Sequence, residues 1–307
     1  MGPAGGGAVR GVVVALGNFD GVHLGHRAVL GRALEEGKAR GMRVVVATFD
    51  PHPRAVLRPG EAPPLLTPLP MRRRLLLDLG VDEVRVIRFD RRLSLKSPEE
   101  FVREVLVGEL GASVVVVGEN FRFGHRAAGD FGDLERLMRS FGGEAVGVPV
   151  RGLDGGQEVS STRIRRLVLE GRVEEASRLL GRPHAVCGRV VEGERRGAKI
   201  GFPTANLRPE EGVVVPGRGV YACVVRVGEE RYAACTNVGV APTFGGRSES
   251  LIEAHLLDFE GDLYGREIEV GFLRRIRGEK KFSGVEELQE QIRRDLQEAR
   301  RITDATI

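Results

Sequence analysis

Short apolar runs alternate with helix-like patterns through the first half of the chain. Five of these runs have the length and the β-branched content of buried strands. They span residues 12–16, 44–49, 83–89, 113–117 and 145–150. Since strands that alternate with helices pair in parallel sheets, this half predicts an α/β domain with a doubly wound parallel sheet.

The helical segments of this half have clear start and stop signals. Ser97-Pro98-Glu99-Glu100 has the form of a capping box with proline at the first helical position, and it predicts a helix to about Val107. Further helices are expected from residue 28 to Gly41 and at 71–79, 133–141, 163–170 and 173–180. Residues 57–70 contain five prolines and predict a loop.

From residue 186 the pattern changes to short strand-like runs between glycine-rich turns, with no helix among them. The runs span 186–191, 213–215, 221–227, 232–237, 252–257 and 267–272. This pattern is typical of an antiparallel barrel or sandwich. A final helix is expected after Ser283-Gly284, with Val285, Leu288, Ile292 and Leu296 on one face.

The chain has the length of two domains. Helix stop signals at Gly181 and Pro183 place the boundary, so we expect one domain over 1–182 and a second over 183–307. The 41% hydrophobic and 29% charged fractions are those of a globular protein. The net charge of +4 suits anionic ligands but does not require nucleic acid.

Other bulk features point to the cytoplasm. Cys187, Cys223 and Cys235 lack metal-like spacing, and their odd number argues against a disulfide framework. The apolar run after the glycine-rich start is too short for a signal peptide, and no stretch is long enough to span a membrane. We therefore expect a cytoplasmic protein with no membrane partner.

The first predicted strand runs into Gly17-Asn18-Phe19-Asp20-Gly21-Val22-His23-Leu24-Gly25-His26. In an open α/β sheet ligands bind at such a strand-to-helix turn, where the helix presents free N–H groups to an anion. His23 and His26 are three apart and share a face on a first helical turn. Two histidines in a loop can be ordinary surface residues, but their setting among glycines at a strand end favours a nucleotide site.

Three further segments carry candidate chemistry in the first half. Residues 48–53 (TFDPHP) and 118–124 (GENFRFG) follow strands at the same sheet edge, and each can also be an ordinary loop. Residues 160–165 (SSTRIR) open a helix, where hydroxyl side chains are common N-caps. Hydroxyls with arginines at a helix start also form a phosphate cradle.

Two segments of the second half combine oxygen ligands with a carboxylate. In Gly201-Phe202-Pro203-Thr204-Ala205-Asn206, Thr204 and Asn206 lie two apart and share a face if the chain is extended. They are hard oxygen ligands of the type that Mg²⁺ accepts, although the segment can also be a plain turn. In the 252–257 run, Glu253 and His255 lie opposite Ile252 and Ala254. A solvated face is the usual position of a glutamate.

These strings together resemble the bacterial bifunctional riboflavin kinase/FAD synthetase family. His-x-Gly-His and SSTRIR are similar to the two signatures of the nucleotidylyltransferase superfamily, and GNFDGVHLGH with TFDPHP is more specific to this family. GFPTAN, IEAHLL and DFEGDLYG resemble riboflavin kinase strings, and the order holds over about residues 11–300. The resemblance implies that ATP phosphorylates riboflavin to FMN, and that AMP is then transferred from ATP to FMN, giving FAD and pyrophosphate.

The resemblance implies an adenylyltransferase site in the first domain, with His23, His26 and Arg163 as catalytic residues. It places ATP at Gly17, Asn18, Phe19, Asp20, Gly25, His26, Asn120, Ser161, Thr162 and Arg163. It places the flavin at Asp50, Pro51, His52, Phe121, Arg122 and Phe123. FMN's phosphate is itself the nucleophile, so this step needs positioning and charge stabilisation but no general base.

In the second domain the resemblance makes Glu253 the base that takes a proton from the ribityl hydroxyl. It assigns ATP and phosphate contacts to Gly193, Gly197, Lys199, Gly201, Pro203, Thr204 and Asn206, with Mg²⁺ held by Thr204 and Asn206. The chain departs from the family at Ala198, where an arginine is expected. Lys199 or Arg196 is the candidate substitute for its phosphate contact.

Two other functions were weighed. A single-activity transferase with a ligand-binding barrel does not account for GFPTAN together with Glu253. An RNA-binding protein is compatible with the basic net charge and with a small barrel. The chain lacks the lysine clusters and the aromatic-interleaved basic strands of single-strand binders, so we expect no nucleic-acid partner. The sequence leaves the oligomeric state open.

Overall fold

The computed structural model describes residues 11–149, 159–193, 197, 200–242 and 248–306. The chain divides into two compact units. Unit 1 contains Met1–Pro63 and Thr67–Ser160, and unit 2 contains Pro64–Leu66 and Ser161–Ile307. The two helices after Ser160, which we expected in the first domain, therefore group with the second compact unit. The boundary between residues 182 and 183 stays a prediction for the functional domains.

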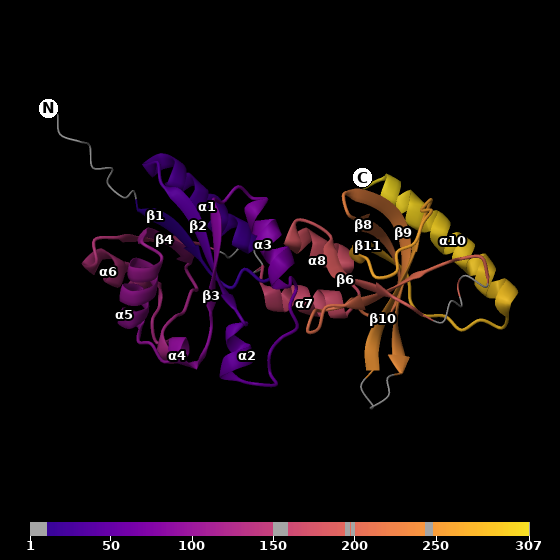
Figure 1. The fold of residues 1–307 in the computed structure, drawn as a ribbon, viewed down its shortest axis with the longest axis horizontal. Coiled ribbons are helices and arrows are strands. Elements are labelled where there is room, and N and C mark those ends of the chain that lie inside the picture. The colour runs from indigo at the N-terminus through magenta and orange to yellow at the C-terminus, as the bar shows by residue number, and fades with distance from the viewer. Residues whose placement is uncertain (1–10, 150–158, 194–196, 198–199, 243–247, 307) are drawn as a thin grey trace. The chain divides into compact units, whose positions relative to one another are not determined.

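Unit 1 is built on a five-stranded parallel sheet (Figure 1). The strands are β1 (Val12–Leu16), β2 (Arg43–Asp50), β3 (Glu83–Arg88), β4 (Ala112–Gly118) and β5 (Glu144–Val148). Their order in the sheet is β3-β2-β1-β4-β5, and every neighbouring pair is parallel. The doubly wound parallel sheet predicted from the alternating pattern is confirmed.

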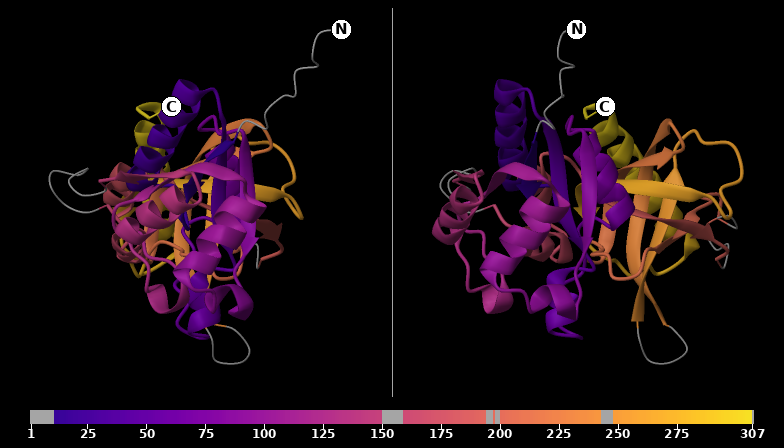
Figure 2. Two further views of the ribbon diagram at one scale, coloured as in Figure 1. Left: turned by 90° about the vertical axis from the view of Figure 1, so that its left-hand side faces the viewer. Right: turned by 60° about the vertical axis from the view of Figure 1, so that its left-hand side comes forward.

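Helices cover both faces of this sheet, as the turned views in Figure 2 show in indigo to magenta. The helices are α1 (Leu24–Arg40), α2 (Pro53–Leu57), α3 (Leu69–Leu77), α4 (Arg91–Ser94), α5 (Pro98–Glu100), η1 (Phe101–Glu109), η2 (His125–Ala127) and α6 (Phe131–Ser140). Val13 and Ala15 of β1 pack in one core with residues of α1 and α3. Val14 and Leu16 pack in another with residues of η1 and α6. Successive strand residues point to opposite faces, so β1 is buried on both sides.

Several helices of unit 1 differ from the prediction, and the short helices α2, α4 and η2 were not predicted. The capping box at Ser97 is present, but after Pro98–Glu100 the helix continues as the π-helix η1, with Leu110 N–H bonded to the Val105 carbonyl at 3.0 Å. The proline-rich segment is shorter as a loop than expected, because α2 ends at Leu57 and α3 already begins at Leu69. Proline is compatible with a helix there, since Pro70 lies in the first turn, where an N–H has no intrahelical partner.

Unit 2 begins with α7 (Ser161–Leu169) and α8 (Val173–Leu180), followed by a closed antiparallel barrel. The barrel strands are β6 (His184–Val191), β7 (Ala205–Pro209), β8 (Gly219–Val227), β9 (Glu230–Pro242), β10 (Ser248–Leu256) and β11 (Glu267–Arg277). They close in the order β10-β7-β6-β11-β8-β9. Val186, Leu207, Ile252 and Phe272 are among the side chains that fill the barrel interior. The antiparallel barrel predicted from the short runs is confirmed.

The barrel strand β7 was not predicted, and the strand that was expected at residues 213–215 is wrong. β7 carries Leu207 as its only large apolar residue, so it leaves no apolar run to detect. Val213 forms only an isolated parallel bridge, and its partner is Leu65. The Leu65 N–H bonds to the Gly212 carbonyl at 2.7 Å, and the Val214 N–H bonds to the Leu65 carbonyl at 2.9 Å. This bridge explains why Pro64–Leu66 group with unit 2.

The C-terminal helix α10 (Val285–Asp304) packs against β8, β9 and β11 of the barrel (Figure 1). Its N-cap is Gly284, and the predicted apolar face is wrong at Val285, which is 57% exposed. Ala299 and Ile302 are buried, and Arg277 of β11 forms a bidentate ion pair with buried Asp295 at 2.8 and 2.9 Å. None of the helices in the described part of the chain combines the length and the apolar content that a membrane span requires.

The fragment 161–307 is expected to fold on its own, and the shorter fragment 184–307 to be much less stable. α8 packs on β6 and β11, Val173 belongs to the barrel core, and Leu179 and Leu180 are buried. At about 1.5–3 kcal/mol for each large buried side chain, losing this helix costs on the order of 5 kcal/mol. That is a large share of the 5–15 kcal/mol, roughly, that stabilises a domain.

Thermal unfolding of the two fragments, followed by circular dichroism, tests this expectation. Neither fragment contains Pro64–Leu66, so the comparison isolates α7 and α8. Equal melting temperatures for the two fragments would show that the helices do not contribute to the stability of the barrel.

Candidate functional site

The segments that carry candidate chemistry in unit 1 follow the carboxyl ends of three neighbouring strands. The loop 17–23 follows β1, the 50–53 segment follows β2, and the 119–124 segment follows β4. Because the strands are parallel, all three segments emerge at one edge of the sheet. The strand order reverses at β1, between β2 and β4, which is where an open α/β sheet binds its ligand.

The loop 17–23 has a strained backbone. Phe19 and Val22 adopt left-handed φ angles of 49° and 43°, which non-glycine residues rarely do and β-branched residues avoid. Each such residue costs about 1–3 kcal/mol. Both side chains are 1% exposed and lie in the core shared with α1, so their burial offsets the strain. Strain of this kind is concentrated at ligand sites.

His23 and His26 are brought together at the start of α1. His23 is the N-cap residue, and its Nδ1 accepts a hydrogen bond from the His26 N–H at 3.3 Å. The two rings stack with their centroids 3.6 Å apart, and the Phe19 ring meets His26 edge-on at 5.3 Å. Since Nδ1 of His23 is an acceptor, a neutral His23 ring carries its proton on Nε2, where it can donate to an anion.

Gly25 allows this stacking. A Cβ atom at Gly25 would lie 3.1 Å from Cε1 and 3.2 Å from Nδ1 of His23, and 3.4 Å from the Val159 carbonyl oxygen. The backbone just before the SSTRIR segment therefore lies beside the histidine pair. Any side chain at this position would press against the His23 ring.

Asp20 is buried, with 1% of its surface exposed. Its Oδ1 accepts hydrogen bonds from the N–H of Thr67 at 2.9 Å and from the Thr67 hydroxyl at 3.2 Å. The Thr67 hydroxyl also accepts a bond from the Gly21 N–H at 2.8 Å. Thr67 was not predicted as part of the site, since a threonine in a proline-rich segment carries no signal of its own.

The predicted flavin residues lie on the two neighbouring loops. His52 is the N-cap of α2 and accepts from the Arg54 N–H, Pro51 follows a cis peptide bond, and Asp50 ends β2. On the other loop Phe121 stacks on Phe123 at 5.7 Å, and Phe123 is 6% exposed within the core. The rest of that loop is exposed: Asn120 is open to solvent, and Arg122 pairs with Asp130 at 3.3 Å.

Ser161, Thr162 and Arg163 form the first turn of α7 in unit 2. Their triphosphate contacts stay a prediction. Arg165, considered above as a further phosphate ligand, is buried, and its Nε donates to the Pro64 carbonyl at 2.7 Å. That bond gives Arg165 a structural role within unit 2, where it helps to hold the Pro64–Leu66 segment.

In unit 2 three polar residues form a row across neighbouring strands. Glu253 of β10 pairs in register with Asn206 of β7 on one side and with Asn237 of β9 on the other. Directly paired residues project to the same face, and the flanking Ile252 and Ala254 fill the barrel interior. The row therefore lies on the outward face of the barrel strands, where Asn206 is covered and only 7% exposed. The Asn237 amide donates to Glu253 Oε2 at 3.4 Å.

Two glycines lie directly against the predicted metal ligands. A Cβ atom at Gly193 would lie 2.2 Å from Nδ2 and 2.8 Å from Oδ1 of Asn206. At Gly197 it would lie 2.3 Å from the Phe202 carbonyl oxygen and 3.4 Å from Thr204 Oγ1. Gly193 and Gly197 can lie this close to Asn206 and Thr204 only because glycine has no side chain. Lys199, Arg196 and Ala198 lie outside the described residues.

The donor set in this row fits Mg²⁺. Asn206 Oδ1 in the row and Thr204 Oγ1 two residues before it are hard oxygen donors. Among the described residues no three His, Cys, Asp or Glu side chains form a dedicated metal cage. Mg²⁺ in nucleotide enzymes is commonly held by few protein ligands together with substrate phosphates, so such a cage is not required.

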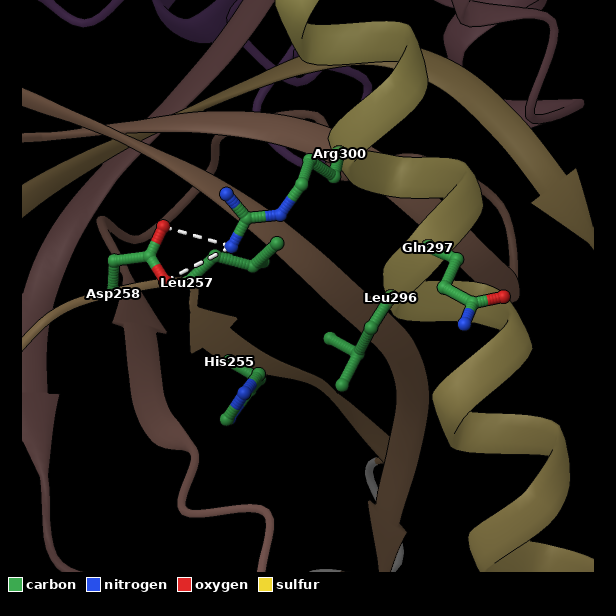
Figure 3. A pocket seen from close by; sticks show the side chains of 6 residues that line it. All are labelled: His255, Leu257, Asp258, Leu296, Gln297 and Arg300. Carbon is green, nitrogen blue, oxygen red and sulfur yellow. Dashed lines mark hydrogen bonds and ion pairs between the residues drawn. The ribbon is translucent and has the colours of Figure 1, made fainter.

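A cavity of about 250 Å³ begins at His255, two residues after Glu253 on β10 (Figure 3). It lies between the end of β10 and α10, and its lining residues are His255, Leu257, Asp258, Leu296, Gln297 and Arg300. Nη2 of Arg300 donates to both carboxylate oxygens of Asp258, at 2.9 and 2.8 Å. His255 Nδ1 donates to the Pro203 carbonyl at 2.6 Å, which ties the cavity to the GFPTAN segment. The cavity is smaller than the ~300–1,000 Å³ of a pocket for a drug-sized ligand.

The fold and these sites define a class. A parallel-sheet unit with a glycine- and histidine-rich loop at its switch point is joined in one chain to a barrel unit that carries oxygen ligands and a carboxylate. This is the arrangement of a two-domain enzyme that uses nucleotides. Comparison with protein families agrees: residues 7–163 match FAD synthetase, and residues 180–303 match riboflavin kinase.

Similar proteins cover almost the whole chain. The bifunctional riboflavin kinase/FMN adenylyltransferase of Escherichia coli K12 is 41% identical over 287 residues, which is 93% of this chain and 91% of that protein. The protein of the same name from Bacillus subtilis is 38% identical over 94% of this chain and 91% of its own length. A crystal structure described as a macrolide-efflux protein from Streptococcus pneumoniae has a TM-score of 0.87 and 34% identity, covering 96% of this chain and 95% of that one. The chain belongs to the bifunctional riboflavin kinase/FMN adenylyltransferase family.

Proposed function

We propose that this chain makes FAD from riboflavin in two steps at two separate sites. The barrel unit phosphorylates riboflavin with ATP, giving FMN and ADP. The site around His23 and His26 then transfers AMP from a second ATP to FMN, giving FAD and pyrophosphate. The observation that carries the proposal is the outer-face row of Asn206, Glu253 and Asn237, which combines oxygen ligands with a carboxylate on three neighbouring strands.

In the kinase step Glu253 accepts the proton of the terminal ribityl hydroxyl. The hydroxyl oxygen attacks the γ-phosphorus of ATP, the bond to the bridging oxygen breaks, and ADP leaves. The Asn237 amide donates to Oε2 of Glu253 and so orients the carboxylate. Thr204 and Asn206, with Gly193 and Gly197 packed against them, hold the phosphate end of ATP.

Mg²⁺ is part of the proposal, with Thr204 and Asn206 as its protein ligands. Bound there with the phosphates, the ion would neutralise charge on the β- and γ-phosphoryl oxygens. Ala198 stands where the family pattern has an arginine, and Lys199 or Arg196 is the proposed replacement for that phosphate contact.

In the adenylylation step an oxygen of the FMN phosphate attacks the α-phosphorus of ATP, and pyrophosphate leaves. No proton acceptor is needed, because the attacking oxygen is already anionic. His23 and His26, at the positive end of α1, stabilise the charge that builds up on the phosphoryl oxygens. Ser161, Thr162 and Arg163 are proposed to hold the triphosphate, and the loops at Asp50–His52 and Asn120–Phe123 to hold FMN.

Incubation of the purified protein with riboflavin, ATP and MgCl₂, followed by chromatographic separation of the flavins, tests the proposal. FMN is expected first and FAD later. One ADP should form for each riboflavin that is phosphorylated, and one pyrophosphate for each FAD. Omitting ATP, or removing the metal with EDTA, should stop both steps. Unchanged riboflavin contradicts the kinase assignment, and FMN that never becomes FAD contradicts the adenylyltransferase assignment.

We also propose that the enzyme is cytoplasmic and acts without a nucleic-acid or membrane partner. Only the small substrates riboflavin, FMN and ATP enter the two reactions. Retention of the protein on immobilised RNA, weakened by salt, would contradict this part of the proposal.

A further inference from the structure

Arg72 is a buried arginine that neither proposed reaction uses. It lies in the first turns of α3, and only 2% of its surface is exposed. Charged side chains are rarely buried to this extent unless they are paired. Its neighbour Arg73 on the same helix is exposed, so the helix does not bury its arginines in general.

The guanidinium of Arg72 bonds to three separate segments. Nη1 donates to the Asn18 carbonyl at 3.1 Å, to the Phe49 carbonyl at 3.3 Å and to the Thr48 hydroxyl at 3.3 Å. Nη2 donates to the Thr67 carbonyl at 3.3 Å. Asn18 belongs to the loop after β1, Thr48 and Phe49 to the end of β2, and Thr67 to the segment before α3.

These contacts connect the two loops that are proposed to hold ATP and FMN. The Thr48 hydroxyl donates to the same Asn18 carbonyl at 2.9 Å, so the two strand ends share one hydrogen-bond network. Thr67, held by Arg72 through its carbonyl, holds Asp20 and the Gly21 N–H in turn. The network therefore forms hydrogen bonds with the loop 17–23 on both sides of Phe19, whose φ angle is 49°.

The arrangement calls for an arginine and not only for a cation. Several backbone carbonyls converge on one point, and a planar guanidinium offers five donors in a fixed fork. A lysine would keep the charge but would reach fewer of these acceptors at once. Burial lowers the pKa of Arg72, and the nearby Asp20 and Asp50 oppose that shift.

We propose that Arg72 is a positioning residue for adenylyl transfer: it sets the distance between the loop 17–23, which ends at His23, and the loop at Asp50–His52. This inference rests on the proposed adenylyltransferase site. Arg72 touches neither substrate, and its effect passes through the carbonyls of Asn18 and Phe49. An error of about 1 Å in such a spacing can cost on the order of 10²-fold in rate.

The test compares Arg72→Lys and Arg72→Met with Arg73→Lys and Arg73→Met in the full-length protein. For each variant, thermal unfolding gives the folded fraction, and kcat and KM are measured for FAD formation from supplied FMN. The kinase rate from riboflavin is measured in the same preparation. The Arg73 variants repeat the chemical change on the exposed neighbour and are expected to match the wild type.

We expect Arg72→Met to lose about 10²-fold in kcat per folded molecule, with a smaller change in KM. Arg72→Lys should recover part of that loss, because it retains the charge and some of the donors. The kinase rate should be unchanged in both. A role limited to stability would lower the melting temperature but leave kcat per folded molecule at the wild-type value.

Wild-type kcat per folded molecule in Arg72→Met overturns the inference. If Arg72→Met does not fold, Arg72→Lys decides: a reduced kcat at normal folded fraction supports the role, and a wild-type kcat overturns it. Failure of the proposed function looks different, because the wild type and the Arg73 variants would then form no FAD either.

Discussion

The Glu253→Gln variant is expected to form FMN about 10²–10⁴-fold more slowly than the wild type, the range that a positioned general base contributes. Glutamine retains the shape of the side chain and its contact with Asn237 but cannot accept the ribityl proton. Riboflavin binding should be largely retained, because the change removes a proton acceptor and not a binding surface. Steady-state kinetics with riboflavin, and a separate riboflavin titration, measure the two effects.

Two controls keep this result specific. FAD formation from supplied FMN, measured in the same preparation, should be unaffected, since that step is assigned to the His23 and His26 site. Glu267→Gln makes the same chemical change at an exposed position of the same barrel and should leave FMN formation unchanged. Normal turnover of riboflavin by Glu253→Gln would mean that the base is elsewhere. Loss of both activities together would mean that the two sites are not independent.

The His26→Ala variant is expected to convert FMN to FAD about 10²–10³-fold more slowly, the usual effect of removing a group that stabilises charge in the transition state. His26 lies at the start of α1, stacked on His23, and we propose that the phosphoryl groups of ATP bind at this positive end of the helix. Phosphorylation of riboflavin should continue at the wild-type rate. Separate assays that start from FMN and from riboflavin measure the two steps.

The stacking of His23 on His26 leads to a second prediction that the same assays test. Because the two rings are 3.6 Å apart, removing either should disturb the other, and the losses in the His23→Ala/His26→Ala double variant should not add. Arg32→Ala, on the exposed side of the same helix, serves as the control for an alanine in α1. An unchanged rate of FAD formation in His26→Ala would remove the basis for assigning the adenylyl transfer to this loop.

The strands of unit 1 could be predicted because their signal is local. The three central strands are short β-branched runs buried on both faces, so β1 was predicted at its observed bounds and β2 and β4 within one residue of theirs. β7 was missed because Leu207 alone carries its apolar signal, and its pairing with β6 and β10 is made by the backbone. The spacing of apolar residues also did not indicate that η1 is a π-helix.

The residues of the candidate sites also divide into those with a local sequence signal and those without one. Glycines, histidines and hydroxyls at strand and helix ends are visible in the sequence, and so His23, His26, Thr204 and Asn206 were predicted. Asn237 belongs to a string that resembles the kinase family, but no role was predicted for it or for Arg72, since an asparagine in a strand and an arginine in a helix have many uses. Only the register of β9 with β10, and the burial of α3 against the sheet, bring them to their partners.

The sequence by itself determined which segments form strands and helices, the parallel and barrel classes of the two halves, and the family-specific strings at the candidate sites. These follow from hydrophobic periodicity and turn chemistry, which act over a few neighbouring residues. The tertiary structure alone decided that Pro64–Leu66 join unit 2, that Arg72 ties Asn18 to Phe49, and that Glu253 lies between Asn206 and Asn237. Those pairings join residues far apart in the chain, and their stability comes from burial and hydrogen bonding that exist only once the whole unit has folded.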